Sequence, residues 1–438
     1  MDLKIYKAIK KYLSARPVRF HMPGHKGGKF LKLNEQFDVT ELDFIGNEQA
    51  VKEAEKDCAK ILGTDFLRFL TDGASSGIFS AIYAVKDQGK KLIINRTAHK
   101  SVFNALKIFN IEPIIVGEKF INGLANVISN QEIALALEEN PDAIGVMLTY
   151  PDYYGRTFDL ESISQTVKKQ GKIIIIDNAH GNHYAYFDAS RYAGRFADIW
   201  IDGVHKTNYT FNQGAIVCSK QAYSEKLDQA VNIFSTTSPS YPILISIEYG
   251  IKHSYYKAKQ EFYRLKEKLE KIKQSLKELN FITIDNNDCF KLTIDIGGSG
   301  YNVKSAKALF EKHGIFAELV SDRHILFMFS TATKNKELNK IVKIIKKLKE
   351  KQVLLNEQID IPKREISYLE AVNEEYELTP LEESAGLIAC ENFGIFPPCY
   401  PIVVAGEVIS ENSISRVLGK ETFGIYNGKV KTLKSKTR

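Results

Sequence analysis

The sequence lacks paired cysteines. Its 438 residues contain five cysteines, none of them in a CxxC pair. This scatter argues against both a disulfide framework and a zinc ribbon. An odd number of unpaired cysteines is typical of a reducing compartment, so we expect a cytoplasmic protein.

Long apolar runs are also missing. No run approaches the length of a membrane span, and the N-terminal stretch MDLKIYKAIKKYLSARP has no apolar signal-peptide core. We therefore expect no membrane partner. With 438 residues and 44% hydrophobic content, the chain is long enough for a large core and for two or three domains.

The charge excess is small. A formal net charge of +7 remains from 60 basic and 53 acidic residues. Part of the excess lies in a lysine-rich helix expected over residues 339–351, whose Ile341, Ile344 and Leu348 give it one apolar face. The lysines are then its solvated side, and the basic C-terminal tail alone is weak support for a nucleic-acid partner, so we expect none.

The most informative stretch is residues 172–206. Four isoleucines at 173–176, a run typical of a buried parallel strand, lead directly into Asp177. A second apolar run, ADIWIDG at 197–203, is followed by His205 and Lys206. Because ligands of open α/β sheets bind at the carboxyl ends of strands, we expect Asp177 and Lys206 at the ends of neighbouring strands.

An amine and a carboxylate so placed suit pyridoxal 5'-phosphate (PLP) chemistry. Lys206 would hold the aldehyde as a Schiff base, and Asp177 would keep the pyridine nitrogen protonated so that the ring accepts electrons. A buried ion pair, or two surface charges, would give the same spacing.

Alternating strands and helices surround this stretch, which indicates a mostly parallel sheet. The turn TDGASSG at 71–77, between a strand and a helix, offers free N–H groups to a phosphate, although an ordinary capped helix start would show the same sequence pattern. Another strand-end turn, RTAHKS at 96–101, carries His99 at the head of a helix, where a polar group is common. Residues 1–14 should form a short helix, and a second, amphipathic helix should end at Gly63. A single long helix is expected after the stretch TTSPSY at 236–241, through about Leu279.

Glycine and proline govern HMPGHKGG at residues 21–28. They forbid a helix, so His21 and His25 cannot form a helical metal pair despite their spacing. HMPGHKGG resembles the N-terminal signature of the bacterial ornithine/lysine/arginine decarboxylases of aspartate aminotransferase fold type I. RTAHKS, TYPDYYGRTFDL at 149–160, DGVHKTNYTFNQGAIVCS at 202–219, TTSPSY at 236–241 and GIFPPCYPIVVAGEVIS at 394–410 extend the resemblance over almost the whole chain.

The resemblance implies an α/β fold, PLP-dependent transferase-like, with a mostly parallel seven-stranded sheet, helices on both faces and smaller α+β domains. Expected segments are an N-terminal arm with the HMPGHKGG loop (1–48), a large PLP-binding domain (49–250), a small α+β domain (251–352) and a C-terminal decarboxylase-type domain (353–438). It also implies the short form, without an N-terminal receiver-like domain.

The resemblance further implies roles for individual residues. Lys206 and Asp177 act as described above, His99 stacks on the ring, Ala179 packs on the opposite ring face, and His205 contacts the phosphate or assists proton transfer. The expected phosphate and cofactor contacts are Gly73, Ala74, Ser75, Ser76, Ser235 and Thr236, with the last two near the phosphate across a subunit interface.

Some positions depart from the family's pattern. Ala74 replaces a hydroxyl residue, Asn178 an acidic residue, and Gly203 a serine that helps to hold the phosphate, a loss of about 1.5–3 kcal/mol unless replaced. In the C-terminal element, Cys399 and Ala405 replace a glycine and a proline. No cysteine or acidic cluster completes a metal site with His180 and His183, so we expect no metal and roles near the ring.

The implied function is decarboxylation of a basic L-amino acid (arginine, lysine or ornithine) in polyamine biosynthesis, by a homodimer or a larger assembly of dimers. Transamination or elimination would need the same aspartate and lysine, and the departures leave open a degenerate regulatory protein. Candidates to bind the distal end of the substrate are Glu41, Asp43 and Glu318.

Overall fold

The structure is a computed structural model that describes residues 1–14, 35–39, 49–352 and 359–434. The HMPGHKGG loop, with His21 and His25, and the candidates Glu41 and Asp43 lie outside the described residues. The chain divides into two compact units. The first comprises Met1–Val85, Ile175–Glu270 and Phe329–Asn335, and the second comprises Lys86–Ile174, Lys271–Met328 and Lys336–Arg438.

Seven strands form the largest sheet, in the order β1-β9-β8-β7-β6-β2-β3. Strand β7 pairs in parallel with β8, and β2 pairs in parallel with both β6 and β3, whereas β9 runs antiparallel to its neighbours β1 and β8. Every residue of β7, β8 and β9 is buried, as their continuous apolar runs predict. The mostly parallel seven-stranded sheet expected from the sequence is confirmed.

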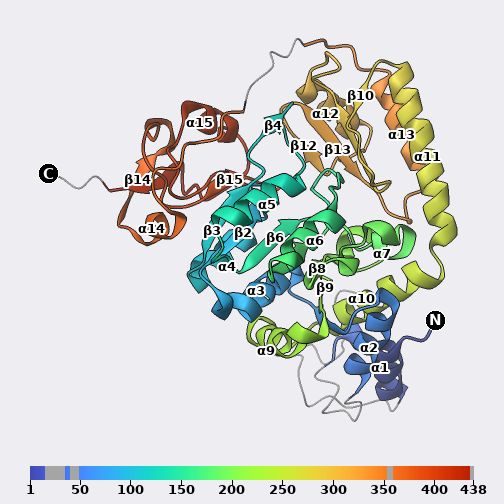
Figure 1. Cartoon of the computed structure of the whole chain (residues 1–438). Coiled ribbons are helices and arrows are strands. Elements are labelled where there is room, and N and C mark those ends of the chain that lie inside the picture. Colours follow the sequence, from blue (N-terminus) through green and yellow to red (C-terminus); the bar gives the residue numbers. More distant parts are fainter. Residues whose placement is uncertain (15–34, 40–48, 353–358, 435–438) are drawn as a thin grey trace. The chain divides into compact units, whose positions relative to one another are not determined.

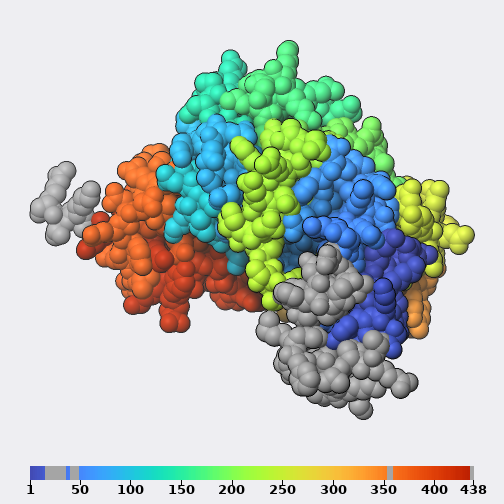
Figure 2. Space-filling view, turned by 90° about the horizontal axis from the view of Figure 1, so that it is seen from below, coloured from blue at the N-terminus to red at the C-terminus, as the bar shows by residue number. Residues whose placement is uncertain are grey.

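The first unit carries the strands β1, β8 and β9 and the helices around them (Figure 1). Helix α2 ends at Gly63, whose φ of 65° provides the left-handed cap that the sequence predicts. Helix α9 packs against α3. Figure 2 shows the yellow-green residues of α9 on the surface beside blue residues of the first unit. Elements of this unit are α1 (Lys4–Ser14), η1 (Glu35–Phe37), α2 (Ala50–Leu62), β1 (Phe66–Leu70), α3 (Gly73–Val85), α7 (Tyr184–Phe187), β8 (Ile199–Asp202), α8 (Val204–Thr207), β9 (Ala215–Ser219), α9 (Ser224–Phe234) and α10 (Tyr241–Tyr256).

The second unit carries the other sheet strands, a small antiparallel sheet in the order β10-β11-β13-β12, and the C-terminal part of the chain. Strand β7 (Ile173–Asp177), helix α11 (Lys259–Glu278) and helix α13 (Asn335–Ile345) span the unit boundaries. Elements of the N-terminal half of this unit are β2 (Lys91–Asn95), α4 (Lys100–Phe109), β3 (Glu112–Val116), β4 (Phe120–Ile121), β5 (Leu124–Ala125), α5 (Asn130–Glu139), β6 (Gly145–Thr149) and α6 (Leu160–Lys169). The later elements are β10 (Ile282–Thr283), β11 (Lys291–Asp295), α12 (Val303–Lys312), β12 (Leu319–Val320), β13 (His324–Met328), α13 (Asn335–Ile345), α14 (Tyr368–Asn373), β14 (Tyr376–Pro380), β15 (Phe393–Ile395), β16 (Pro401–Val403), α15 (Glu411–Val417), β17 (Thr422–Phe423) and β18 (Lys429–Leu433).

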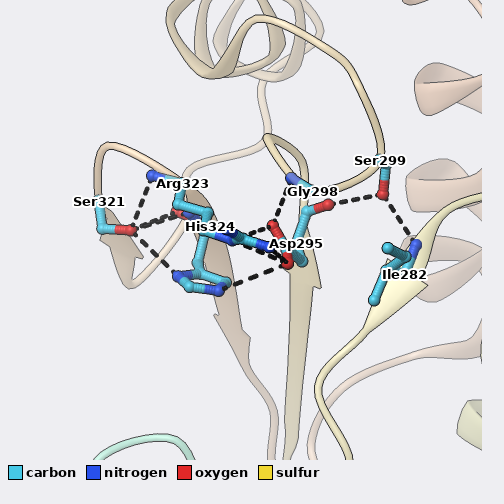
Figure 3. A network of polar contacts seen from close by, with 7 residues as sticks. All are labelled: Ile282, Asp295, Gly298, Ser299, Ser321, Arg323 and His324. Carbon is cyan, nitrogen blue, oxygen red and sulfur yellow. Dashed lines mark hydrogen bonds and ion pairs between the residues drawn. The ribbon is translucent and has the colours of Figure 1, made fainter. Parts of the chain in front are cut away.

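A polar cluster closes one end of the small antiparallel sheet (Figure 3). Arg323 donates from Nε and Nη2 to the buried carboxylate of Asp295, with an Nη2–Oδ2 distance of 2.7 Å. The Ser321 hydroxyl accepts the backbone N–H groups of Arg323 and His324. His324 is 1% exposed, and burial lowers its pKa to about 4. The hydroxyl and carboxylate are thus engaged in holding the turn between β12 and β13.

The C-terminal part has its own apolar core. Leu381, Phe393 and Val403 belong to it. Cys399 adopts a φ of 66°, the left-handed region that favours glycine, and its carbonyl accepts the N–H of Lys100 at the start of α4. The departure from glycine at this position therefore falls where the backbone conformation disfavours a side chain.

Two helix boundaries predicted from the sequence are wrong. The lysine-rich helix covers Asn335–Ile345 rather than 339–351, although Ile341, Ile344 and Leu348 are buried as expected. The single long helix expected after TTSPSY is broken at Lys257 into α10 and α11. In the part of the chain that the structure describes, no helix is long and apolar enough to cross a membrane.

Candidate active site

Asp177 and Lys206 lie at the carboxyl ends of adjacent parallel strands. Asp177 is the last residue of β7 and is opposite Ile201 of β8 in the parallel register. The chain leaves β8 at Asp202 and turns through Gly203 into the short helix α8, which carries His205 and Lys206. The predicted placement of the acid and the amine on neighbouring strand ends is confirmed.

Asp177 is a buried carboxylate with few partners. It is 3% exposed, and its one hydrogen bond from a described residue comes from the N–H of Ala179, 3.2 Å from Oδ1. Burial raises the pKa of Asp177, and the positive charge of Lys206 and the Ala179 hydrogen bond lower it. An ionised carboxylate can accept several hydrogen bonds, so this one has spare capacity for a cationic N–H donor such as a pyridinium.

Lys206 contacts His180, which the sequence predicted to lie near the ring without a specific role. Its Nζ lies 3.1 Å from Nε2 of His180, which is buried. The backbone N–H of Lys206 donates to the carbonyl of Gly203 and holds the turn. The His180 contact fixes the direction of the amine, because it leaves Lys206 fewer accessible rotamers.

Gly203 allows a close approach of two backbone segments. A Cβ atom at this position would lie 2.6 Å from the carbonyl oxygen of Ala179 and 3.2 Å from Cδ of Lys206. A serine, as in the family's pattern, would therefore collide with the backbone that follows Asp177. The departure from serine has a steric reason in this chain.

The candidate phosphate contacts gather at the start of α3. Gly73 has a φ of 78°, its N–H donates to the carbonyl of Gln213, and the Ser76 hydroxyl lies 3.0 Å from the Gly73 carbonyl oxygen. The N–H of Thr236 lies 3.3 Å from Oδ2 of Asp72, the residue before the helix. The structure thus brings TTSPSY to this helix start within one chain.

Two hydroxyls near this helix start differ in their exposure to solvent. Ser75 is exposed, and the hydroxyl of Ser235 is buried without a hydrogen-bond partner among the described residues. Together with the first N–H groups of α3, around Ala74, these are donors of the kind that bind a phosphate. The roles of Gly73, Ala74, Ser75, Ser76, Ser235 and Thr236 stay predictions.

His205 is held by its own loop. Its Nδ1 lies 2.9 Å from the carbonyl oxygen of Gly214, which also accepts the His205 backbone N–H. Burial lowers the pKa of His205, the hydrogen bond to Gly214 raises it, and Lys206 lowers it. The neutral ring with its proton on Nδ1 leaves Nε2 as the atom that accepts.

His99 lies in the second unit, where it caps α4. Its Nδ1 accepts the N–H of Ser101 at 3.2 Å and lies 2.7 Å from the Ser101 hydroxyl oxygen. This is the helix-start role that the sequence left open, and the stacking of His99 on a ring stays a prediction. So does the packing of Ala179, a 6% exposed residue, on the other ring face.

The buried polar network around Asp202 was not predicted from the sequence. Asp202 is 0% exposed and accepts hydrogen bonds from the Asn178 amide, the Asn182 amide at 2.7 Å and the Tyr192 hydroxyl at 2.8 Å. Asn208, two residues after Lys206, donates to Oδ1 of Asn182 at 2.7 Å. A carboxylate that ends the apolar run ADIWID was the available signal, and it is the same signal that identified Asp177.

The donors and acceptors present fit PLP. An amine that can bind the aldehyde and a buried carboxylate with spare acceptor capacity lie on one edge of the sheet, and free donors lie at a helix start. His180 and His183, the HxxH pair, are both buried. The residues described in the structure contain no group of three His, Cys, Asp or Glu side chains that could hold a metal ion.

Comparisons with known proteins identify the family of the chain. The model of the family "Orn/Lys/Arg decarboxylase, major domain" matches residues 4–295. An arginine decarboxylase of Bacillus subtilis is 28% identical over 467 residues, which cover 97% of this chain and 94% of that protein. The crystal structure of a Francisella novicida lysine decarboxylase has a TM-score of 0.82 at 17% identity, covering 99% of this chain and 81% of that chain. A variant serine palmitoyltransferase from S. paucimobilis with a bound PLP–myriocin aldimine has a TM-score of 0.57 at 14% identity, covering 78% of this chain and 83% of that chain. The chain therefore belongs to the Orn/Lys/Arg decarboxylase family and is a PLP-dependent amino-acid decarboxylase of fold type I.

Proposed function

We propose that the chain decarboxylates a basic L-amino acid to the corresponding amine and carbon dioxide, with arginine the first substrate to test among arginine, lysine and ornithine. The observation that carries the proposal is the nearly unpartnered carboxylate of Asp177 on the strand next to the one that leads to Lys206. Arginine comes first because the arginine decarboxylase of Bacillus subtilis matches this chain over almost its full length.

Bound PLP supplies the electron sink for the pair left when the bond between Cα and the carboxylate breaks. Asp177 would accept the pyridinium N–H and keep that nitrogen protonated, because an ionised carboxylate in a buried site stabilises an adjacent cation. Lys206 would hold the aldehyde between turnovers, yield it to the substrate amine, and take it back after the product forms.

The other residues would position these groups. His180 would direct the Lys206 amine, and His205, with its Nδ1 tied to Gly214, would present Nε2 to the phosphate or to a proton in transfer. The start of α3, with Ser235 and Thr236, would receive the phosphate. Ala179 would leave room for one ring face, and His99 would stack on the other.

Glu318 is the one described candidate for the distal end of the substrate. It is exposed, and its carboxylate accepts the hydroxyl of Tyr153 at 2.7 Å. Glu41 and Asp43 remain candidates from the sequence. A carboxylate is the group that would pair with a guanidinium or an ammonium.

Two departures from the family's pattern that suggested a degenerate regulatory protein have local structural reasons. The Ala179 carbonyl occupies the space that a serine at 203 would need, and Asn178 donates to Asp202. These arrangements favour a catalytic site over that of a degenerate regulatory protein. Transamination and elimination stay as alternatives that product analysis separates from decarboxylation.

We also propose a homodimer or a larger assembly of dimers, a cytoplasmic location and a place in polyamine biosynthesis. The location is supported by the five cysteines, none of which forms a disulfide within the described residues. We keep the four-segment division (1–48, 49–250, 251–352, 353–438) as a proposal, to be tested by limited proteolysis.

The test is release of labelled carbon dioxide from carboxyl-labelled arginine, lysine and ornithine by the purified protein with added PLP. Release from one substrate, lost in Lys206→Ala, would establish the reaction and name the substrate. A protein that binds PLP and releases none from any of the three would refute the proposed substrate class. Glu318→Gln should raise KM more than it lowers kcat if Glu318 binds the distal group.

A further inference from the structure

Asp202 is a second buried carboxylate, at the end of the strand β8 that neighbours the one ending in Asp177. It is 0% exposed, and its hydrogen bonds from described residues all come from neutral groups, namely two asparagine amides and the Tyr192 hydroxyl. No ion pair with a described lysine or arginine neutralises it. A chain that buries a charge without a counter-ion bears a large desolvation penalty, which calls for a functional reason.

The direction of each hydrogen bond shows that Asp202 accepts all three. The Tyr192 oxygen accepts the indole N–H of Trp200 at 2.9 Å, so its own proton points to Asp202. Oδ1 of Asn182 accepts donors from Tyr186 and Asn208, so its amide N–H faces Asp202. Three converging donors stabilise the ionised carboxylate.

The network fastens Asp202 to both halves of the candidate site. Through Asn178 and Asn182 it holds the segment that follows Asp177, and Asn182 also binds Asn208, on the far side of Lys206 in the chain. The pKa of Asp202 is raised to about 6, with burial as the largest cause. The charge of Asp177 contributes to the increase, so the two carboxylates lie close to each other. The two carboxylates therefore interact electrostatically at this edge of the sheet.

We propose that Asp202 is a positioning residue that supplies a buried negative charge close to Asp177 and thereby favours the protonated form of the bound cofactor. This inference rests on the proposed roles of Asp177 and Lys206. Its chemistry is electrostatic: a fixed anion in a low-dielectric site raises the proton affinity of basic nitrogens near it, and it does so without touching the substrate.

The experiment titrates the absorbance of bound PLP with pH and measures the cofactor dissociation constant in wild type, Asp202→Asn and the exchange variant Asn178→Asp/Asp202→Asn. Removing the charge should lower the pH midpoint of the absorbance change by about one unit or more and weaken PLP binding about tenfold. The exchange variant moves the carboxylate to the other end of the same hydrogen bond, and it should recover at least half of the midpoint shift.

Tyr192→Phe is the matched control. It removes one of the three donors and leaves the charge, so its midpoint should stay within about 0.3 unit of wild type even if its unfolding temperature falls. Asp202→Ser provides a second variant without the charge if Asp202→Asn does not fold. A merely structural role would lower the unfolding temperature of these variants and leave the midpoint in place.

Separate outcomes test the inference and the proposed site. If wild type binds PLP, Lys206→Ala lacks its absorbance band, and folded Asp202→Asn keeps the wild-type midpoint and dissociation constant, the inference about Asp202 is wrong and the site stands. An exchange variant no better than Asp202→Asn would also overturn it. If Lys206→Ala binds PLP with the wild-type band, the proposed site itself is wrong.

Discussion

Restoring the family's serine at position 203 should harm this protein. A Cβ atom on residue 203 would lie 2.6 Å from the carbonyl oxygen of Ala179, well inside van der Waals contact. That carbonyl cannot retreat easily, because the N–H of Ala179 is bonded to Asp177 and the neighbouring Asn178 is bonded to Asp202. We expect Gly203→Ser to lower the free energy of unfolding by about 1–3 kcal/mol, the usual range for overpacking.

The expected gain does not offset this loss. A new hydrogen bond from the serine to the cofactor phosphate would be worth about 1.5–3 kcal/mol, but only with the geometry that the collision disturbs. Gly203→Ala separates the two effects, because it introduces the same Cβ atom without a hydroxyl. Both variants should bind PLP more weakly than wild type, and the serine should recover at most part of the loss seen with alanine.

Urea unfolding of the cofactor-free protein gives the stability change, and absorbance titration with PLP gives the dissociation constant. Equal stability of wild type and Gly203→Ser, combined with tighter PLP binding by the variant, would show that the 177–182 segment yields to the side chain. The steric account of the glycine would then be wrong.

Three further perturbations test other parts of the structure. Asp177→Asn should stabilise the cofactor-free protein by about 1–3 kcal/mol, because it removes a buried charge that has one hydrogen bond, and it should weaken PLP binding at least tenfold. Calorimetry measures the change in stability and titration with PLP measures the change in binding. A destabilised variant would contradict the reasoning. In urea unfolding, Glu407→Gln should lower the free energy of unfolding by about 3–5 kcal/mol, because it removes the buried counter-ion of the 2% exposed Arg96 and leaves it only the half-exposed Glu118, whereas Arg96→Met/Glu407→Leu should lower it less. His324 has a pKa of about 4 in the folded protein, below the ordinary value, so the unfolded chain takes up its proton first and stability should fall as pH drops from about 6.5 to 4, by up to about 1.4 kcal/mol per unit. His324→Gln should flatten this part of the urea midpoint against pH, and an unchanged slope would refute the assignment.

The strands and the two principal site residues could be predicted from the sequence because their signals are local. A run of four isoleucines before Asp177 specifies a buried strand, and the carboxyl end of such a strand faces the ligand edge of an α/β sheet. The same logic located Lys206 after β8. The turn at Gly63 and the helix cap at His99 were equally local, since each depends on a residue and its immediate neighbours.

What escaped prediction depends on distant contacts. Arg96 and Glu407 form a buried ion pair across 311 positions of sequence, and no composition or period links them. The approach of Ala179 to Gly203 and the bonds of Asn182 to Asp202 and Asn208 are tertiary as well. The break at Lys257 lacks a proline or glycine, so the apolar pattern alone suggested one continuous helix.

Asn178 and Gly203, two of the departures from the family's pattern, belong to a single local arrangement. Asn178 donates to Asp202, which draws the segment after Asp177 toward the end of β8, and the carbonyl of Ala179 then fills the space beside Gly203. Residues that share a contact in this way have coupled effects on stability. Changing position 203 or 178 alone to the family's residue should therefore lower the free energy of unfolding more than changing both together, because only the joint change lets the backbone after Asp177 move away from the turn that carries Lys206.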